Sequence, residues 1–222
     1  MLHKTRGIVF RFTRYGETSI IVNVFTEAFG LQTYIANGVR SKSSRNKIAL
    51  YQPLTLLDLV VYHRPQANIN RIKEIKCLYA YKTLATDVRK SAIAMFLNEV
   101  LNKVVKDESH AQEIADFLIA SFIALDTQIA QFENFHLIFL VQLSRFLGFG
   151  AHHVDEVLGP RLANPLVEEI IRRLLVADYA EVIAMTNVQR REILELIISF
   201  FADHIETMGE IRSLQILREV MG

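Results

Sequence analysis

Apolar and polar residues follow different patterns on the two sides of residue 80. Before it, runs rich in β-branched and aromatic residues are separated by turn material such as Tyr15-Gly16-Glu17 and Asn37-Gly38, which is typical of strands joined by tight turns. The predicted strands cover residues 8–12, 19–25, 31–36, 54–62 and 69–75. Five short strands in a segment of this length favour a small closed barrel.

Helical periodicity begins after Tyr81. Apolar residues spaced three and four apart over residues 93–105 predict an amphipathic helix, and the capping box at 109–112 opens a second one. Residues 135–149 are apolar nearly all round, which indicates a buried helix at the centre of a bundle. Further helix starts are predicted at Asn164-Pro165, at Asn187 as an N-cap, and near Ser213.

These patterns predict an α+β protein with two domains. The N-terminal five-stranded β-barrel covers residues 1–80, and an all-α helical domain covers residues 81–222. A loop rich in glycine and proline over residues 148–165 divides the helical domain into two halves.

The formal net charge of +1 conceals a strong asymmetry along the chain. Residues 1–82 contain thirteen Lys and Arg but four Asp and Glu, a net charge of +9, and the remainder carries −8. An excess of this size in so short a segment is self-repulsive, and folding alone would not favour it. The barrel is therefore predicted to bind a polyanion.

The cations and tyrosines of the barrel suggest a groove that follows a phosphate backbone while aromatic rings stack on bases. Tyr15 and Tyr62 are further candidates for stacking, and residues 38–47 form either a phosphate-grasping loop or a plain solvated connector. The predicted DNA-binding residues are Arg11, Arg14, Tyr34, Arg40, Lys42, Arg45, Lys47, Arg71, Lys73 and Lys76.

Catalytic and metal-binding patterns find little support in the sequence. The four acids of the basic half are isolated, so no pair is spaced to hold Mg²⁺ for phosphodiester cleavage. His152 and His153 are adjacent and lack an obvious third ligand, which favours two loop histidines over a metal site. We expect no enzymatic activity, no cofactor and no metal.

The single cysteine, Cys77, excludes an internal disulfide and a four-cysteine zinc site, so a reducing cytoplasm is the expected compartment. The N-terminus lacks the pattern of a secretory signal, and the most apolar stretch is shorter than the ~20 residues that span a bilayer. We predict a cytoplasmic protein that does not contact a membrane.

Arginines of the helical domain are spaced for surface ion pairs. Glu168-Glu169 with Arg172-Arg173, and Arg190-Arg191 with Glu195, stand four residues apart on predicted helices. An acidic partner peptide with an apolar tip would need an apolar pocket rimmed by cations, and the weak candidates for that rim are Arg145, Arg172 and Arg173.

Several short motifs, in this order and spacing, resemble the recombination mediator family RecO. Each motif alone is weak, but together they cover nearly the whole chain. They are Gly7-Ile8-Val9, Tyr15-Gly16-Glu17, Val24-Phe25-Thr26 with Gly30, Gly38-Val39-Arg40, the run from Gln52 to Leu57, Asn98-Glu99-Val100-Leu101, Leu147-Gly148-Phe149, and Ser213 to Leu217.

The resemblance implies an OB-fold barrel, binding to single- and double-stranded DNA, and annealing of complementary strands. It also implies partnership with RecR and with the C-terminal tail of the single-strand-binding protein SSB, and through them the loading of RecA, in the nucleoid. Many members carry a four-cysteine zinc module after the Leu-Gly-Phe motif, and residues 151–161 contain no cysteine.

A different class of function also fits the composition. A helical adaptor protein could use its basic barrel to bind RNA or a protein partner. Equal-length DNA and RNA oligonucleotides, offered to the chain in parallel, would separate the two hypotheses.

Overall fold

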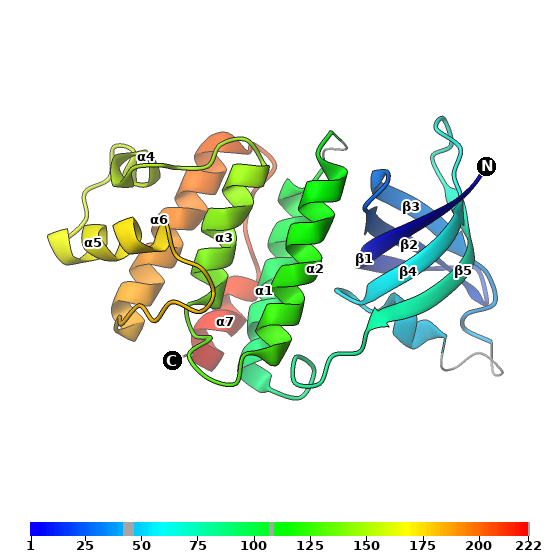
Figure 1. The fold of residues 1–222 in the computed structure, drawn as a ribbon, viewed down its shortest axis with the longest axis horizontal. Helices are drawn as coiled ribbons and strands as arrows, with labels where there is room; N and C mark the ends of the chain where they lie inside the picture. The colour runs from blue at the N-terminus through cyan, green and yellow to red at the C-terminus, as the bar shows by residue number, and fades with distance from the viewer. Residues whose placement is uncertain (42–46, 107–108, 222) are drawn as a thin grey trace. The chain divides into compact units, whose positions relative to one another are not determined.

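The computed structural model describes residues 1–41, 47–106 and 109–221 (Figure 1). Contacts within the chain divide it into two compact units. One comprises Met1–Tyr81 with Val105–Ile123, and the other comprises Lys82–Val104 with Ala124–Gly222. Among the described residues, no helix is long and apolar enough to cross a membrane.

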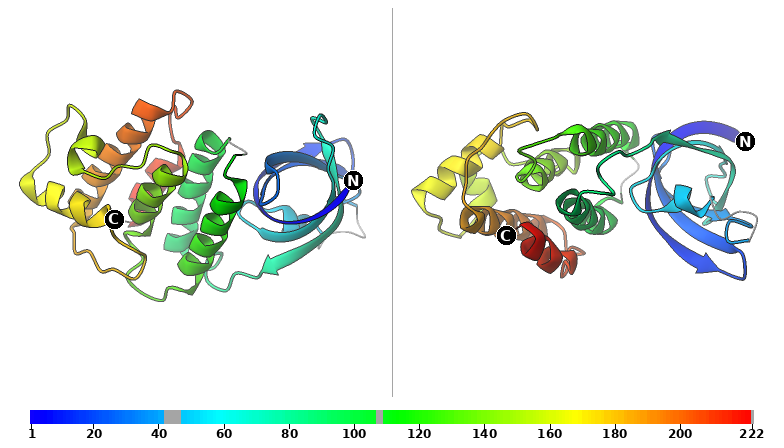
Figure 2. Two further views of the ribbon diagram at one scale, coloured as in Figure 1. Left: turned by 45° about the horizontal axis from the view of Figure 1, so that its top comes forward. Right: turned by 90° about the horizontal axis from the view of Figure 1, so that it is seen from below.

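The first unit is built on five strands that close into a barrel, confirming the predicted architecture (Figure 2). The strands are β1 (Leu2–Tyr15), β2 (Ser19–Thr26), β3 (Gly30–Ala36), β4 (Leu56–Tyr62) and β5 (Asn70–Tyr79), and a short 3-10 helix η2 (Ile48–Tyr51) precedes β4. Their order round the barrel is β1-β2-β3-β5-β4, with β3 and β5 parallel and the other neighbours antiparallel.

β1 is longer than the sequence predicts, because it serves two neighbours. Residues 2–8 pair with β4, and residues 7–15 pair with β2 after an irregularity between Val9 and Arg11. Such an irregularity lets one strand bend round the barrel. Gly7 sits where both pairings meet, and a Cβ there would come within 2.8 Å of the Val24 side chain.

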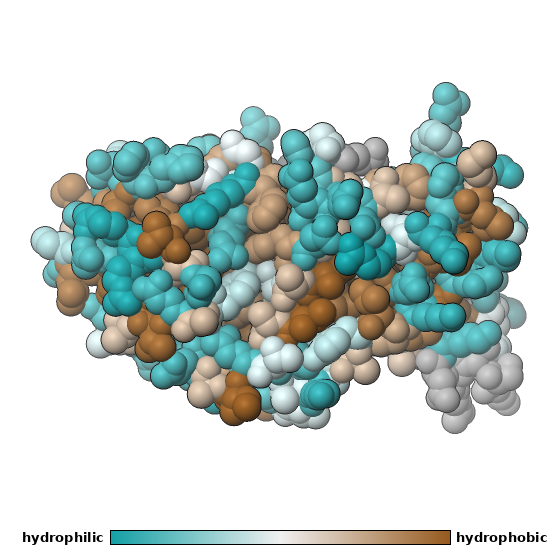
Figure 3. Space-filling model, in the orientation of Figure 1, coloured by the Kyte–Doolittle hydropathy of each residue, from teal (hydrophilic) through white to brown (hydrophobic). Residues whose placement is uncertain are grey.

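Alternation along β2 and β3 separates the barrel core from its outer surface. Ile20, Val22 and Val24 are fully buried, whereas Ile21 and Asn23 between them are half-buried on the outside. Figure 3 shows one face of the molecule, on which hydrophilic side chains are interspersed with hydrophobic ones.

The first unit also includes part of helix α2 (Ala111–Thr127). Arg6 of β1 donates to the carboxylates of Glu27, at 2.8 Å, and of Asp116 on α2, at 2.6 Å. These hydrogen bonds raise the pKa of Arg6, and the bond from Arg6 lowers the pKa of Glu27. The interaction fixes the helix to the barrel and neutralises one cation of the basic half.

The second unit is helical. Its elements are α1 (Val88–Val104), α3 (Phe135–Phe146), α4 (Val154–Leu158), α5 (Pro165–Leu174), α6 (Asn187–His204) and α7 (Ser213–Met221), together with the last residues of α2. Every side chain from Phe135 to Val141 in α3 is buried, which confirms the predicted central helix. The packed helix pairs include α1 with α7, and α6 with both α3 and α4.

Two helix starts test the predicted caps. The side chain of Asn164 accepts from the Leu166 N–H with Pro165 at the first helical turn, as predicted. The predicted N-cap at Asn187 is wrong by one residue: Thr186 caps α6 and forms a capping box with Gln189. Asn187 instead accepts from Arg190 at 2.5 Å.

Two carboxylates, the buried Asp126 and the half-buried Glu99, anchor backbone segments in the second unit. Asp126, only 1% exposed, accepts from the N–H groups of Lys82, Thr83 and Leu84 at 2.7–3.0 Å. Glu99 of α1 accepts from the N–H of Arg212 and from both the N–H and the hydroxyl of Ser213, and so caps α7. Two of the short motifs, around Glu99 and Ser213, therefore meet in space.

Candidate nucleic-acid interface

The outer surface of β1, β2 and β3 carries two rows of aligned side chains. In the first row Arg11 stands opposite Asn23, which stands opposite Thr33. Arg11 Nε donates to Asn23 Oδ1 at 3.3 Å, and Asn23 Nδ2 donates to Thr33 Oγ1 at 3.1 Å. The result is a hydrogen-bonded polar ladder that begins at the exposed Arg11.

The second row lies one step along the same strands. It runs from Thr13 through Ile21 and Ile35 to Arg71, the second residue of β5. Ile21 and Ile35 are half-buried and Arg71 is exposed. An apolar strip thus lies between Thr13 and Arg71, next to the row that begins with Arg11. An unpaired base could rest on such a strip while its phosphates meet the two arginines.

Two further arginines lie at the end of this surface, by the turn between β1 and β2. Arg14 is exposed near the end of β1, where it stands opposite the buried Ile20, so it lies on the other side of the strand from Arg11 and at the end of the barrel. The Arg40 N–H donates to the Thr18 carbonyl at 3.0 Å, and its guanidinium donates to the Gly16 carbonyl at 3.1 Å. Gly16 has φ +57, a left-handed conformation that suits the tight turn.

We call Arg11, Arg14, Arg40 and Arg71, with Asn23 and Thr33, the cationic face. Within the described part of the chain, none of these four arginines forms an ion pair with a carboxylate. Unpaired, exposed guanidinium groups are what a phosphate backbone needs, because each can exchange its counterion for a phosphate.

Lys73 and Lys76 lie elsewhere on β5, among acids. The ammonium of Lys73 lies 3.9 Å from the carboxylate of Glu74, and Lys76 stands directly opposite Asp58 of β4. The surface of β4 and β5 is therefore mixed in charge. These two lysines are therefore not part of the cationic face.

Tyr34 is not available to stack on a base, which corrects the sequence prediction. Its side chain is fully buried in the barrel core with Val22 and Val24, and this burial raises its pKa. Tyr15 and Tyr62 are exposed, and Tyr62 stands opposite Arg71. These two rings are the aromatic candidates that remain.

The lysines and arginine predicted to bind DNA from residues 42–47 are only partly among the described residues. Lys42 and Arg45 lie outside the described residues. Lys47 is exposed just before η2.

The sequence prediction did not include four residues of this outer surface, namely Asn23, Thr33, Ile21 and Ile35. The alternation from Ser19 to Val24, with Ile20, Val22 and Val24 at the inward positions, is the signal that could have identified Asn23.

The three arginines predicted for a partner-binding rim take part in internal contacts. Arg145 donates to the Leu175 carbonyl, Arg172 pairs with Glu169, and Arg173 donates to Glu181 at 3.0 Å. The predicted pairings four residues apart are wrong here, because Arg172 reaches a carboxylate three residues away and Arg173 reaches one beyond the helix. Glu195 likewise pairs with Arg218, at 2.5 Å, instead of Arg191.

Two family models match successive parts of the chain. Residues 1–81 match the family described as Recombination protein O N terminal, and residues 85–164 match Recombination protein O C terminal. Relatives named DNA repair protein RecO include those of Bacteroides fragilis and Phocaeicola vulgatus, each 31% identical over 99% of both chains. That of Christiangramia forsetii is 30% identical over the full length of both.

The fold defines a protein with an OB-type barrel followed by helices, and the barrel carries exposed arginines that have no carboxylate partner among the described residues. Full-length similarity then identifies the lineage. The chain belongs to the RecO family of DNA repair proteins.

Proposed function

We propose that this protein is a non-enzymatic recombination mediator that binds single- and double-stranded DNA through the cationic face and anneals complementary strands. Exposed arginines without carboxylate partners among the described residues carry the proposal: Arg11 and Arg71 on the outer surface of the OB barrel, and Arg14 and Arg40 near the turn between β1 and β2. The outer surface of strands 2 and 3 and the neighbouring turns are where OB folds take oligonucleotides.

The chemistry that annealing needs is electrostatic and positional. Two complementary strands repel each other through their phosphates, and a surface that neutralises both backbones lowers that repulsion while the bases pair. No bond in either strand is made or broken. Among the described residues there is no group of three or more His, Cys, Asp or Glu side chains that could hold a metal ion.

The proposed partners are RecR and the SSB tail, and the proposed outcome is the loading of RecA onto SSB-coated DNA. Membership of the RecO family supports this part of the proposal, and the expected location is the cytoplasm, at the nucleoid. The barrel surface of β4 and β5, with mixed charge, remains free for a protein partner while DNA occupies the cationic face.

The test compares two double variants of equal charge change on the same barrel. R11A/R71A removes two arginines of the cationic face, and K73A/K76A removes the two lysines of β5. We expect R11A/R71A to weaken binding of a single-stranded oligonucleotide at least tenfold and to slow annealing, with K73A/K76A close to the parent protein. A larger loss in K73A/K76A would place the DNA on β5.

The adaptor hypothesis is tested by the same binding assay. DNA and RNA oligonucleotides of equal length and sequence are compared at one salt concentration. Tight RNA binding with weak DNA binding and no strand annealing would overturn the mediator proposal and favour the adaptor.

A further inference from the structure

The apolar strip on the outside of the barrel consists of two isoleucines that stand side by side. Ile21 of β2 lies directly opposite Ile35 of β3 in the antiparallel pairing of these strands. Their neighbours in the chain, Ile20, Val22 and Tyr34, are fully buried in the barrel core, so the two isoleucines point outward. Both are half-buried, and part of each hydrocarbon side chain therefore faces water in the free protein.

Polar side chains border this strip on the outer surface of the barrel. The hydrogen-bonded ladder that begins at Arg11 lies one step along the strands in one direction. One step in the other direction, the exposed Tyr15 stands opposite Ser19, whose hydroxyl donates to Asn37 Oδ1 at 3.0 Å. The strip thus adjoins polar groups on both sides and ends at the cation of Arg71.

The faces of DNA bases can reach an apolar strip only when the bases are unpaired. In a duplex the base faces are stacked on one another, and the outer surface offers phosphates, sugars and base edges. In a single strand the faces of unstacked bases are open, and side chains of a binding protein can cover them. Ile21 and Ile35 can therefore cover a base face of a single strand but not one of a duplex.

The arginines beside the strip do not distinguish the two forms of DNA. Arg11 and Arg71 are both exposed, and each can replace a counterion at a phosphate of either form. Charge therefore supplies an affinity that single-stranded and double-stranded DNA share. Burial of apolar surface against a base adds to the affinity of the single strand alone.

We propose that Ile21 and Ile35 determine the preference of this surface for unpaired strands. The inference rests on the proposed function, because it assumes that DNA occupies the cationic face, and it adds the residues that separate the two forms of DNA. During annealing the bases leave the strip as they pair. The duplex is then held by the arginines alone, and it dissociates more readily than the strands from which it forms.

The first test measures the affinity of I21T/I35T for a single-stranded oligonucleotide and for a duplex of the same sequence and length. Threonine keeps the β-branched shape that suits a strand and shortens the apolar part of the side chain. We expect the affinity for the single strand to fall about tenfold and that for the duplex to change by less than about twofold. An equal loss for both forms, or no loss for the single strand, would overturn the inference.

Val60 of β4 offers a matched control. It is half-buried on the outer surface of the same barrel, opposite Lys4 and Glu74 and outside the cationic face. V60T should bind both forms of DNA as the parent protein does, and thermal unfolding should show that it and I21T/I35T are folded. A loss of single-strand affinity in V60T as large as that in I21T/I35T would contradict the assignment.

The milder variant I21V/I35V keeps the test decisive if the threonine variant does not fold. It removes one methylene group from each side chain, and it should lower the affinity for the single strand about threefold without changing that for the duplex. A variant that folds and binds the single strand as the parent protein does would overturn the inference.

An oligonucleotide composed of abasic nucleotides shows whether the strip contacts bases. It carries the phosphates but no base, so the parent protein and I21T/I35T should bind it equally. A difference as large as that for the normal single strand would mean that the isoleucines act through the backbone or through the fold, and the inference would fail.

Failure of this inference can be told apart from failure of the proposed function. If the parent protein binds neither form of DNA, the proposed function fails and the inference fails with it. If R11A/R71A weakens binding of both forms while I21T/I35T binds both as the parent protein does, the proposed function stands and only the inference fails.

Discussion

The arginines of the two units differ in whether a carboxylate lies next to them. In the helical unit Arg161, Arg172, Arg173 and Arg218 each face a carboxylate within 4.0 Å. On the cationic face Arg11, Arg14, Arg40 and Arg71 face carbonyls, amides or solvent. Under the proposed function, the pairing of each arginine, and not the count of cations, distinguishes a structural arginine from one that is free to bind phosphate.

Arg6 shows that the number of cations in the barrel overstates how many of them are free of a carboxylate. It adds to the basic charge of the N-terminal half, yet Glu27 and Asp116 neutralise it. Because Asp116 lies 110 residues away in the chain, the sequence gives no sign of this pairing. Only the folded unit shows that Arg6 fixes α2 to the barrel.

The largest effect should come from a buried charge in the helical unit. D126A would leave three backbone N–H groups without an acceptor and remove the carboxylate whose charge favours ionised Lys90, itself only 2% exposed. We expect a loss of about 3–5 kcal/mol in the free energy of unfolding, measured with urea. The exposed control E206A should change it by less than about 0.5 kcal/mol. A small loss in D126A would contradict the anchoring role.

Glu99 should show a smaller effect that depends on pH. Burial raises the pKa of Glu99, but hydrogen bonds from Ser213 and Arg212 outweigh it, and the net pKa is lowered. A lowered folded-state pKa means that the stabilisation is complete above the unfolded-state pKa and is lost as pH falls through the folded-state value. E99Q should cost about 1–2 kcal/mol at pH 7.

The urea midpoint of the parent and of E99Q, measured from pH 7 down to pH 3, checks this sign. The difference between the two proteins should shrink as pH falls. A difference that stayed constant over that range would show that the Glu99 charge has no part in capping α7.

Arg6 should contribute less, because it is partly exposed and water screens the pair. R6Q should lower the free energy of unfolding by about 0.5–1 kcal/mol, seen as a lower urea midpoint. If the pairing is structural only, DNA affinity at moderate salt should remain near that of the parent. A loss of DNA affinity as large as that of R11A/R71A would erase the distinction between paired and unpaired arginines.

The smallest effect on stability is expected on the cationic face. R11A/R71A removes two exposed charges and one 3.3 Å hydrogen bond, so the free energy of unfolding should change by less than about 0.5 kcal/mol. Thermal unfolding and DNA affinity, both measured on R11A/R71A, should show an almost unchanged stability together with a large loss of binding. A strongly destabilised variant would mean that these arginines, too, are structural.

The strand pattern could be predicted from the sequence, but which side of β3 faces inward could not. Gln32, Tyr34 and Ala36 share one side, and Leu31, Thr33 and Ile35 share the other, so both sides mix apolar and polar residues. Pairing with β2 decides the matter, because Tyr34 stands opposite the buried Val22. That contact depends on register, which periodicity does not contain.

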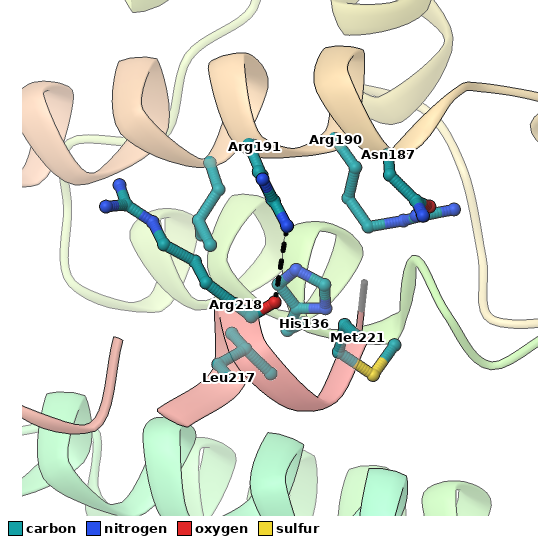
Figure 4. A pocket seen from close by; sticks show the side chains of 8 residues that line it. His136, Asn187, Arg190, Arg191, Leu217, Arg218 and Met221 are labelled. Atoms are coloured by element: carbon teal, nitrogen blue, oxygen red, sulfur yellow. Dashed lines mark hydrogen bonds between the residues drawn. The ribbon is translucent and has the colours of Figure 1, made fainter. Parts of the chain in front are cut away.

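The extent of β1 was missed for a similar reason. Lys4 and Arg6 interrupt the apolar pattern of residues 2–8, and the strand forms there because β4 offers a partner. A small hollow lined by His136 of α3 and by arginines of α6 and α7 could not be predicted either (Figure 4). The run from Phe135 is almost uniformly apolar, and the arginines that meet His136 come from other helices. Local patterns predict elements, whereas sites depend on which elements meet.

The salt dependence of single-stranded DNA binding tests the central claim most directly. Each phosphate neutralised contributes about −0.7 to the slope of log affinity against log salt concentration. R11A/R71A should reduce the magnitude of that slope by about 1.4, and R172A/R173A, which removes two paired arginines of the helical unit, should leave it unchanged. An unchanged slope in R11A/R71A, or an equal reduction in R172A/R173A, would contradict the claim that the unpaired arginines of the barrel bind the phosphates.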